Sequence, residues 1–309
     1  MMIMLVTTAL FVQTGDLKIK IDGKAGDITV FAADPNGDAR LLANQIRAGF
    51  FMDPFGAKQD ARVAMTDTGA TLSVKPGTYH VRIRTDDAAG SADSSSGVWL
   101  TQLKVEAGKT LDAAVKIGAP GSVKGAWSVD KSAQSGNKLE GTTAALARDG
   151  KVWAFAKGGK GGAFEIKGVA PGTYSLVVSD MFEKFLSVTD NVSVAEGKES
   201  AVKVDVKRAG LGGVRAQFTD KAGKPAAPPK DVILVDERGR FAAESNAGGS
   251  TGDIEFIGWI WLPSGGGYIL RAEGVERKSV TLKAPVIKGS GAFAEEIYET
   301  LKVPLGGGK

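Results

Sequence analysis

The sequence predicts an all-β protein built from three tandem antiparallel sandwiches. The main evidence is a glycine-bearing turn that leads into a tyrosine and recurs as VKPGTY (residues 74–79), VAPGTY (169–174) and LPSGGGY (262–268). The three tyrosines are 95 and 94 residues apart. A near-constant period of this length lets each copy enclose its own core, so it indicates three small repeated domains instead of one large fold.

Short apolar runs between glycine-containing turns are the second observation. The 309 residues include 42 glycines, spread along the chain and not gathered in one block. Residues 170–178 and 200–206 show the short apolar or alternating runs of half-buried strands. This pattern is typical of an Ig-like sandwich, whose two sheets bury alternate side chains.

The ends of the copies predict the domain boundaries. Gly-Lys turns inside residues 105–117 and 194–206 each suggest a closing hairpin, and residues 296–303 suggest the last strand of the third copy. We predict a candidate signal-peptide remnant at 1–14 and sandwiches at 15–118, 119–208 and 209–309.

One segment has the apolar spacing of a helix, residues 39–51 in the first copy. Its large apolar side chains lie roughly on one helical face: Leu41, Leu42, Ile46, Phe50 and Phe51. We interpret this segment as a loop insertion peculiar to the first copy.

The stretch GAFEIKGVAPGTYSLVV (162–178) resembles the signature of carboxypeptidase regulatory-like domains. These are prealbumin-like β-sandwich modules that are also related to Cna B-type repeats of surface adhesins. The third copy is similar at 223–225, 231–236 and 253–258, while the first keeps only KPGTY (75–79) and flanking strands. The resemblance implies prealbumin-like sandwiches used as spacers, adhesin stalks, carbohydrate-contacting modules or accessory domains of enzymes, and it carries no catalytic residues.

The recurring tyrosine is interpreted as a folding residue. Its ring can fill the space between the sheets while its hydroxyl bonds back to the preceding turn. The Pro-Gly before it suits the turn, because proline fixes φ and glycine accepts positive φ.

The inventory of reactive side chains argues against catalysis. The chain has one histidine and no cysteine, which excludes a cysteine nucleophile, a disulfide and a Cys/His zinc site. His80 follows Tyr79 inside an alternating strand, so we expect it to face solvent. Paired acids, as in glycoside hydrolysis, keep an enzyme as an alternative. We predict a protein that is not an enzyme and has no cofactor.

Two acidic loops raise the question of calcium. Asp34, Asn36 and Asp38 have the alternating oxygen ligands with which a calcium loop begins, but the glycine and closing glutamate of a full loop are missing. A plain turn is the alternative. Asp86 and Asp87 lie in a Ser/Gly-rich loop and form the other candidate metal site.

Aromatic residues in the third copy are the candidate ligand-binding residues. When the copies are matched at their tyrosine turns, Trp259 takes the place of Val169, while Trp261 belongs to a four-residue insertion. A tryptophan on a sandwich rim can stack on a sugar ring or anchor a protein interface. The alternative is an insertion that folds back over the core. The remaining tryptophans are expected to be buried in strands: Trp99, Trp127 and Trp153.

Charge does not point to nucleic acid. The net charge is +4, and the three predicted domains carry 0, +3 and +1, so none presents a phosphate-tracking surface. The excess on the middle domain could attract acidic glycans or an anionic membrane, with scattered solvated lysines as the alternative.

Residues 1–12 are apolar and uncharged, and they resemble the hydrophobic region of a signal peptide without its charged flank. The segment is too short to span a bilayer, and a first β-strand is the alternative reading. We therefore predict a secreted or cell-envelope protein with no transmembrane segment.

The sequence as a whole predicts a non-catalytic exported surface or envelope protein that acts as a structural spacer and binding module. Its expected partners are other surface proteins or polysaccharide, and self-association through outer strands stays open. The alternatives are a carbohydrate-binding protein that uses Trp261 and an accessory domain protein of a hydrolase. A pure spacer is expected to be elongated.

Overall fold

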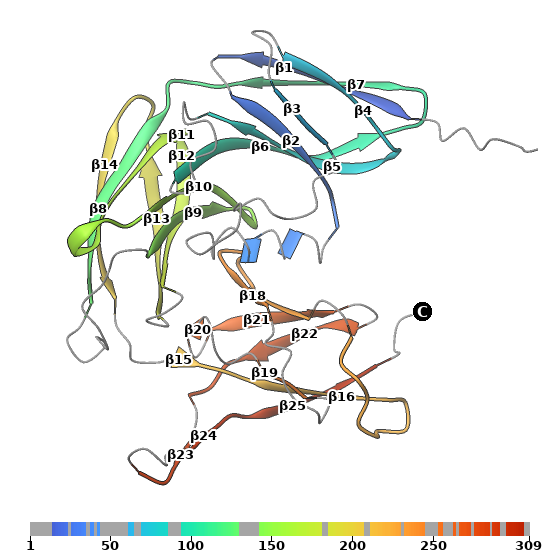
Figure 1. Cartoon of the computed structure of the whole chain (residues 1–309), viewed down its shortest axis with the longest axis vertical. Coiled ribbons are helices and arrows are strands. Elements are labelled where there is room, and N and C mark those ends of the chain that lie inside the picture. The colour runs from blue at the N-terminus through green and yellow to red at the C-terminus, as the bar shows by residue number, and fades with distance from the viewer. Residues whose placement is uncertain are drawn as a thin grey trace, which may run out of the picture.

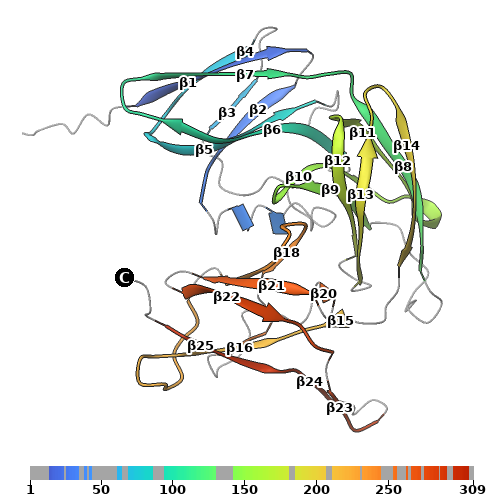
Figure 2. The ribbon, with the colours of Figure 1, turned by 180° about the vertical axis from the view of Figure 1, so that it is seen from behind.

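The computed structural model is all-β, as predicted, and the strands among its described residues form seven separate sheets (Figures 1 and 2). The statements below concern the residues that the structure describes: 14–23, 26–34, 38–39, 42–43, 61–64, 69–85, 94–129, 142–180, 185–206, 211–229, 232–244, 253–255, 262–263, 266–272, 275–284, 286–290 and 295–305.

The first copy is a sandwich of a three-stranded and a four-stranded layer. The three-stranded layer has the order β4 (Gly69–Val74), β1 (Gly15–Asp22), β7 (Thr110–Lys116). The four-stranded layer has the order β6 (Ser94–Val105), β5 (Gly77–Arg84), β2 (Asp27–Ala32), β3 (Ala61–Ala64).

The second and third copies repeat this topology strand for strand. In the second copy the three-stranded layer has the order β11 (Ala163–Val169), β8 (Gly121–Val129), β14 (Glu199–Val206). Its four-stranded layer has the order β13 (Phe185–Val194), β12 (Gly172–Asp180), β9 (Thr143–Arg148), β10 (Lys151–Lys157). A 3-10 turn, η2 (Lys160–Gly162), lies between β10 and β11. In the third copy the three-stranded layer has the order β19 (Asp253–Glu255), β16 (Arg215–Thr219), β25 (Thr300–Pro304). Its four-stranded layer has the order β22 (Val275–Thr281), β21 (Gly267–Ala272), β17 (Ile233–Asp236), β18 (Ala242–Glu244). Two short ladders accompany the third copy: β15 (Leu211–Gly212) with β20 (Leu262–Pro263), and β23 (Val286–Lys288) with β24 (Glu295–Ile297).

The Gly-Lys turns at the end of the copies do not close hairpins, so that prediction was wrong. Strand β7 pairs in parallel with β1 in the opposite layer from β6, and β14 pairs in parallel with β8 in the same way. The turn therefore carries the chain from one sheet to the other, where the last strand seals the sandwich beside the first. The predicted last strand at 296–303 is also divided, between β24 and β25.

The first and second copies share one continuous sheet. Strand β10 of the second copy pairs with β6 of the first through Ala154↔Ser96, Phe155↔Ser95 and Ala156↔Ser94, which joins two four-stranded layers into a sheet of eight. We call this contact the first joint. The three partners on β6 are all serines, whose small side chains let the two edge strands approach even though β10 presents Phe155 between two alanines.

Strands β9 and β10 are buried on both faces. Their burial is continuous from Thr143 to Ala147 and from Lys151 to Ala156, with no alternation between buried and exposed positions. Trp153 and Leu146 face the core of the second copy, while Ala147 and Phe155 belong to a different cluster that is centred on the third copy. Burial on two faces explains why these strands read as unbroken apolar runs.

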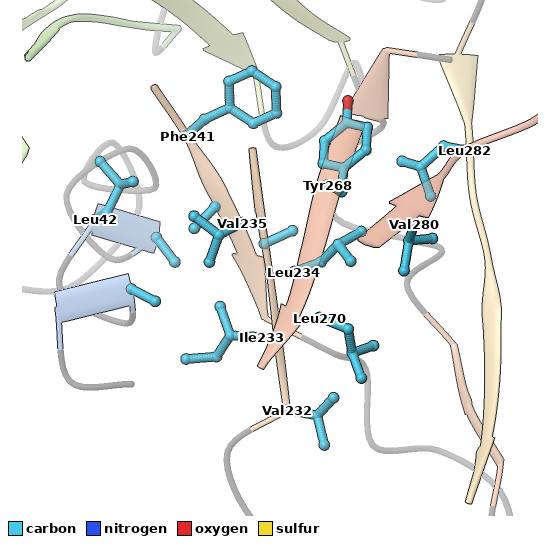
Figure 3. Packing of buried hydrophobic residues seen from close by; sticks show 14 of the residues in the cluster. Leu42, Val232, Ile233, Leu234, Val235, Phe241, Tyr268, Leu270, Val280 and Leu282 are labelled. Atoms are coloured by element: carbon cyan, nitrogen blue, oxygen red, sulfur yellow. The ribbon is translucent and has the colours of Figure 1, made fainter. Parts of the chain in front are cut away.

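Of the predicted helical insertion, 39–51, the structure describes Ala39, Leu42 and Ala43, while Leu41, Ile46, Phe50 and Phe51 lie outside the described residues. Residues 38–39 and 42–43 are helical, and Ala39, Leu42 and Ala43 are buried in the cluster centred on the third copy. Figure 3 shows Leu42 beside Val235 and Phe241 of the third copy. All three copies therefore contribute to one apolar cluster.

This packing folds the chain back on itself. In both views the first and third copies lie on either side of the helical stretches, with the second copy beside them (Figures 1 and 2). The elongated shape expected of a pure spacer is not found, because Ala39, Leu42 and Ala43 of the first copy pack in the apolar cluster centred on the third copy.

Candidate functional site

The recurring tyrosines have the structural role predicted for them. The Tyr79 hydroxyl donates to the Lys75 carbonyl at 2.6 Å, and the Tyr174 hydroxyl donates to the Ala170 carbonyl at 2.7 Å. Both rings are buried, as is Tyr268 in the third copy. Burial raises the pKa of Tyr174 despite the nearby charge of Arg148. The hydroxyl bonds of Tyr79 and Tyr174 hold the turn against the strand that follows it.

A β-bulge lies beside the tyrosine in the first two copies. The register of β5 and β6 shifts between Tyr79 and Val81, and Gln102 on the bulged strand has φ of 58°. The register of β12 and β13 shifts just after Tyr174, where Asn191 has φ of 61°. A bulge re-aims side chains at the rim of a sheet. The residues at these two bulges lie at the joints between copies.

At the first joint, His80 is buried, so the prediction that it faces solvent was wrong. Its exposed fraction is 1%, and its Nε2 lies 2.9 Å from Asp38 Oδ2. The backbone N–H of Gln102 donates to Nδ1 of the same ring at 3.4 Å. Strand alternation fails here because Asp38, which also pairs with Lys151 of the second copy, lies on what would otherwise be the outer face.

Asp38 joins His80 to the second copy. Lys151 Nζ lies 3.6 Å from Asp38 Oδ2, and the Lys151 side chain is 6% exposed. Burial by itself would raise the pKa of Asp38, but the hydrogen bond from His80 and the charge of Lys151 outweigh it and lower the pKa. Asp38 therefore acts as the anionic centre of the joint.

At the second joint, between the second and third copies, Asp190 on β13 is the acid that pairs with basic residues of the next copy. Ser175 follows Tyr174 and donates to Asp190 Oδ1 at 2.7 Å. Arg240 Nη1 and Arg238 Nη1 lie 3.0 and 3.2 Å from Asp190 Oδ2. The hydrogen bond from Ser175 is the leading cause of the lowered pKa of Asp190, and the two arginines lower it further. An acid at the bulge of one copy thus binds basic residues from the next.

The two joints use equivalent turns. Lys151 follows Gly150 in the turn between β9 and β10, and Arg240 follows Gly239 in the turn between β17 and β18. Both glycines have positive φ, 70° and 65°, and a Cβ built on Gly239 would lie 3.1 Å from the Cα of Gly150. The basic residue after this glycine docks on the acid of the preceding copy in both cases.

A polar pocket of about 300 Å³ lies at the second joint. We call it the arginine pocket. Residues from both copies line it, among them Arg148, Thr173, Ser175, Asn191, Arg238 and Arg240. It is the candidate binding site of the described chain.

Arg148 is held in this pocket by aromatic rings. Its guanidinium carbon lies 3.5 Å from the centre of the Trp153 ring and 4.9 Å from that of Tyr174. The Trp153 Nε1 donates to the Arg148 carbonyl at 3.3 Å, and the two rings meet edge to face at 6.0 Å. Among the described residues Arg148 forms an ion pair with exposed Asp149, whose Oδ2 lies 3.7 Å from its Nε. Within the part of the chain that the structure describes, the guanidinium has no hydrogen-bond partner.

Several predicted site residues lie outside the described residues: Trp259, Trp261, Asn36, Asp86 and Asp87. Asp34 is exposed and accepts a hydrogen bond from the Asp38 amide at its carbonyl, 2.7 Å away. The Asp38 carboxylate pairs with His80 and Lys151 and is not grouped with Asp34. Trp99, Trp127 and Trp153 are buried, as predicted.

The described residues show neither a metal centre nor a helix that spans a membrane. No group of three or more acidic, histidine or cysteine side chains in the described segments could hold a metal ion. Among the helical stretches placed by the structure, none is long and apolar enough to cross a membrane.

The arginine pocket was not predicted from the sequence. A signal for it exists in the matching turns RDGK (148–151) and ERGR (237–240), which concentrate charge at equivalent points of two copies. It could not be recognised as a site because the two turns meet only when the copies fold together.

Comparison with known proteins leaves the family open. No family model matches the sequence, and no curated protein matches it significantly. The resemblance to carboxypeptidase regulatory-like modules therefore stays a resemblance of motifs.

Similar solved structures include the Bacillus anthracis TIE protein, with 17% identity, a TM-score of 0.23 and coverage of 95% of this chain and 51% of that one. They also include a streptococcal ancillary pilin, with 11% identity, a TM-score of 0.22 and coverage of 95% and 99%. BcpA, the major pilin subunit of Bacillus cereus, has 10% identity, a TM-score of 0.19 and coverage of 95% and 99%. This chain spans about half the length of the first of these. Scores of this size carry no assignment, and the fold described above rests on this chain's own strand pairing.

Proposed function

We propose that this chain is a non-catalytic protein of the cell surface or envelope, which serves as a structural unit and a binding module. The observation that supports it most is the arginine pocket, where two copies together present a guanidinium with unused donors. A joint between domains is a common place for a ligand site. The surface location is the sequence prediction, carried into this proposal.

The state of His80 supports a non-catalytic role. It is the single histidine of the chain, and its imidazole is 1% exposed and bonded to Asp38. A general base has to come within hydrogen-bond reach of the proton that it removes. Buried in the first joint, His80 has no such access to a substrate. An accessory role beside a hydrolase is compatible with this arrangement.

The proposal is tested by retention of the purified chain on insoluble and immobilised cell-wall and extracellular polysaccharides and on surface-protein extracts. We expect saturable retention without chemical change of the material. Turnover of a polysaccharide or peptide would contradict the non-catalytic role. Trp261→Ala, run beside the unchanged chain, separates binding by the third-copy loop, the second candidate, from binding elsewhere.

A further inference from the structure

The unused hydrogen-bonding groups of Arg148 are the starting point. Its guanidinium lies against Trp153 at 3.5 Å and near Tyr174 at 4.9 Å, so stacking holds it in place. Stacking occupies the face of a guanidinium and leaves the N–H groups in its plane available to an acceptor. Because the Trp153 ring is itself tied to the Arg148 carbonyl, the group is pre-oriented and loses little freedom when it binds.

The fold does not require an arginine at this position. In the third copy Glu237 takes the equivalent place, one residue past the strand that corresponds to β9. A side chain built on Gly172 would collide with Arg148 Nη1, and one built on Gly267 would collide with Glu237 Oε2. Both side chains therefore cross the glycine at the start of the tyrosine strand. The same architecture accepts either sign of charge, so the charge of Arg148 points to something other than folding.

The rest of the pocket indicates what the guanidinium would bind. Arg238 lines the pocket from the third copy with its side chain 71% exposed and one contact, from Nη1 to Asp190 Oδ2 at 3.2 Å, while Arg240 pairs with both Asp236 and Asp190. The hydroxyls of Thr173 and Ser175 and the amide of Asn191 also line the pocket.

The three arginines that line the pocket face two lining carboxylates, Asp149 and Asp190, so the lining has a balance of one positive charge. Such a balance favours a ligand with a single negative charge over a doubly charged phosphate. The neutral donors and acceptors suit a ligand rich in hydroxyl groups.

We propose that the arginine pocket binds a carboxylate-bearing sugar residue of an acidic polysaccharide, with Arg148 and Arg238 on the carboxylate. A planar carboxylate matches the paired N–H groups of a guanidinium. A volume of about 300 Å³ is at the lower end of small-molecule sites and suits one or two sugar units. This inference rests on the proposed binding function and names its ligand class.

The test uses the full chain and a galacturonic acid oligosaccharide as probe, with binding followed by titration calorimetry. Its methyl ester removes the negative charge, and a glutamate peptide offers carboxylates without sugar hydroxyls. The variant is Arg148→Glu, which the third copy shows to be compatible with the turn. The matched control is Lys203→Glu, the same charge change at an exposed position on β14, in the other sheet of the second copy.

We expect Arg148→Glu to weaken binding of the acid by about tenfold or more, since a hydrogen bond to a charged group is lost. Lys203→Glu should leave binding within about twofold, and both variants should keep the unfolding temperature of the unchanged chain. Arg148→Lys, which keeps the charge and loses the paired geometry, should be intermediate.

Equal loss in Arg148→Glu and Lys203→Glu would overturn the pocket and show a diffuse charge effect. Binding of the methyl ester as strong as that of the acid, or of the peptide in preference to the sugar, would overturn the ligand class. Retention on another polysaccharide that is lost in Trp261→Ala and kept in Arg148→Glu would overturn the pocket while leaving the proposed function intact. Absence of retention on every material would contradict the proposed binding function itself.

Discussion

At the scale of single residues, the acid in the first joint does the most to connect the copies. Asp38 receives a hydrogen bond from His80 of its own copy and pairs with Lys151 of the next. A buried ion pair does not always add stability, but a buried charge whose partner is removed is strongly destabilising. Without Asp38, the charge of Lys151 would lose this partner while its side chain is only 6% exposed.

The pH dependence of stability should report this contact. The pKa of Asp38 is lower in the folded chain than the ordinary value of 3.8. Its contribution to the free energy of unfolding is then complete above the unfolded pKa and is lost as the pH falls through the folded one. We predict that Asp38→Asn lowers the free energy of unfolding by about 3 kcal/mol at pH 7. The difference from the unchanged chain should shrink below about pH 4, because both chains then lack that charge.

Urea unfolding at several pH values measures this difference. The control is Asp149→Asn, whose carboxylate is 80% exposed and lies 3.7 Å from Arg148, so it should change stability by less than about 1 kcal/mol. Unfolding curves for Asp38→Asn that run parallel to the unchanged chain at every pH would speak against the ionised role of Asp38.

At the scale of elements, the long connection between β2 and β3 of the first copy stands where the other copies have a short turn, and it carries residues that pack against the third copy. In the other two copies the corresponding connection is the glycine turn of β9 and β10 or of β17 and β18. In the first copy it carries Ala39, Leu42 and Ala43 into a cluster with the third copy. The insertion thus connects two sandwiches that are not neighbours in the sequence.

Leu42 tests this role. Its side chain is 1% exposed and lies beside Phe241 (Figure 3). Leu42→Ala should lower the free energy of unfolding by about 2 to 5 kcal/mol, from lost burial and the cavity left behind. Chemical denaturation measures the effect, with Val286→Ala as control because Val286 is 63% exposed. An equal and small effect in both variants would mean that the insertion does not hold the third copy.

At the scale of the whole molecule, the three copies form one body. The first and second share an eight-stranded sheet, and the second and third are joined by the charges around Asp190. Together with the insertion, these contacts hold each copy to both of the others. A pocket formed by two copies keeps its shape only if that arrangement is rigid.

Small-angle scattering distinguishes this arrangement from a string of sandwiches. A compact chain of this length has a radius of gyration of about 19 Å, whereas three domains placed end to end would give about 30 Å. We predict a value within a few ångströms of the compact figure. The value should increase in Leu42→Ala if that variant frees the third copy. A value near the extended figure for the unchanged chain would contradict the folded-back shape.

Much of the local structure is determined by the sequence alone. The tyrosine turns appear where the motif places them, and the hydroxyl bonds of Tyr79 and Tyr174 were expected from the same pattern. These features depend on residues close together in the chain: a turn sets its own φ angles, and a hydroxyl reaches a carbonyl four residues away. The burial of three strand tryptophans follows in the same way from their size and position.

Tertiary structure decides which faces of the strands are covered. Alternation predicted an exposed His80, but the side chain is buried and contacts Asp38 and the backbone of Gln102. A short motif also could not show that the Gly-Lys turn changes sheets, because strand pairing is settled by partners about a hundred residues away.

The arginine pocket depends on tertiary structure most of all. Arg148 and Arg238 are 90 positions apart, and the sequence around each indicates only a charged residue in a turn. The sequence by itself determined three sandwiches and their tyrosine clamps. Only the packing of the sandwiches against one another brought charged turns together, because that packing depends on long-range burial, which no local pattern records.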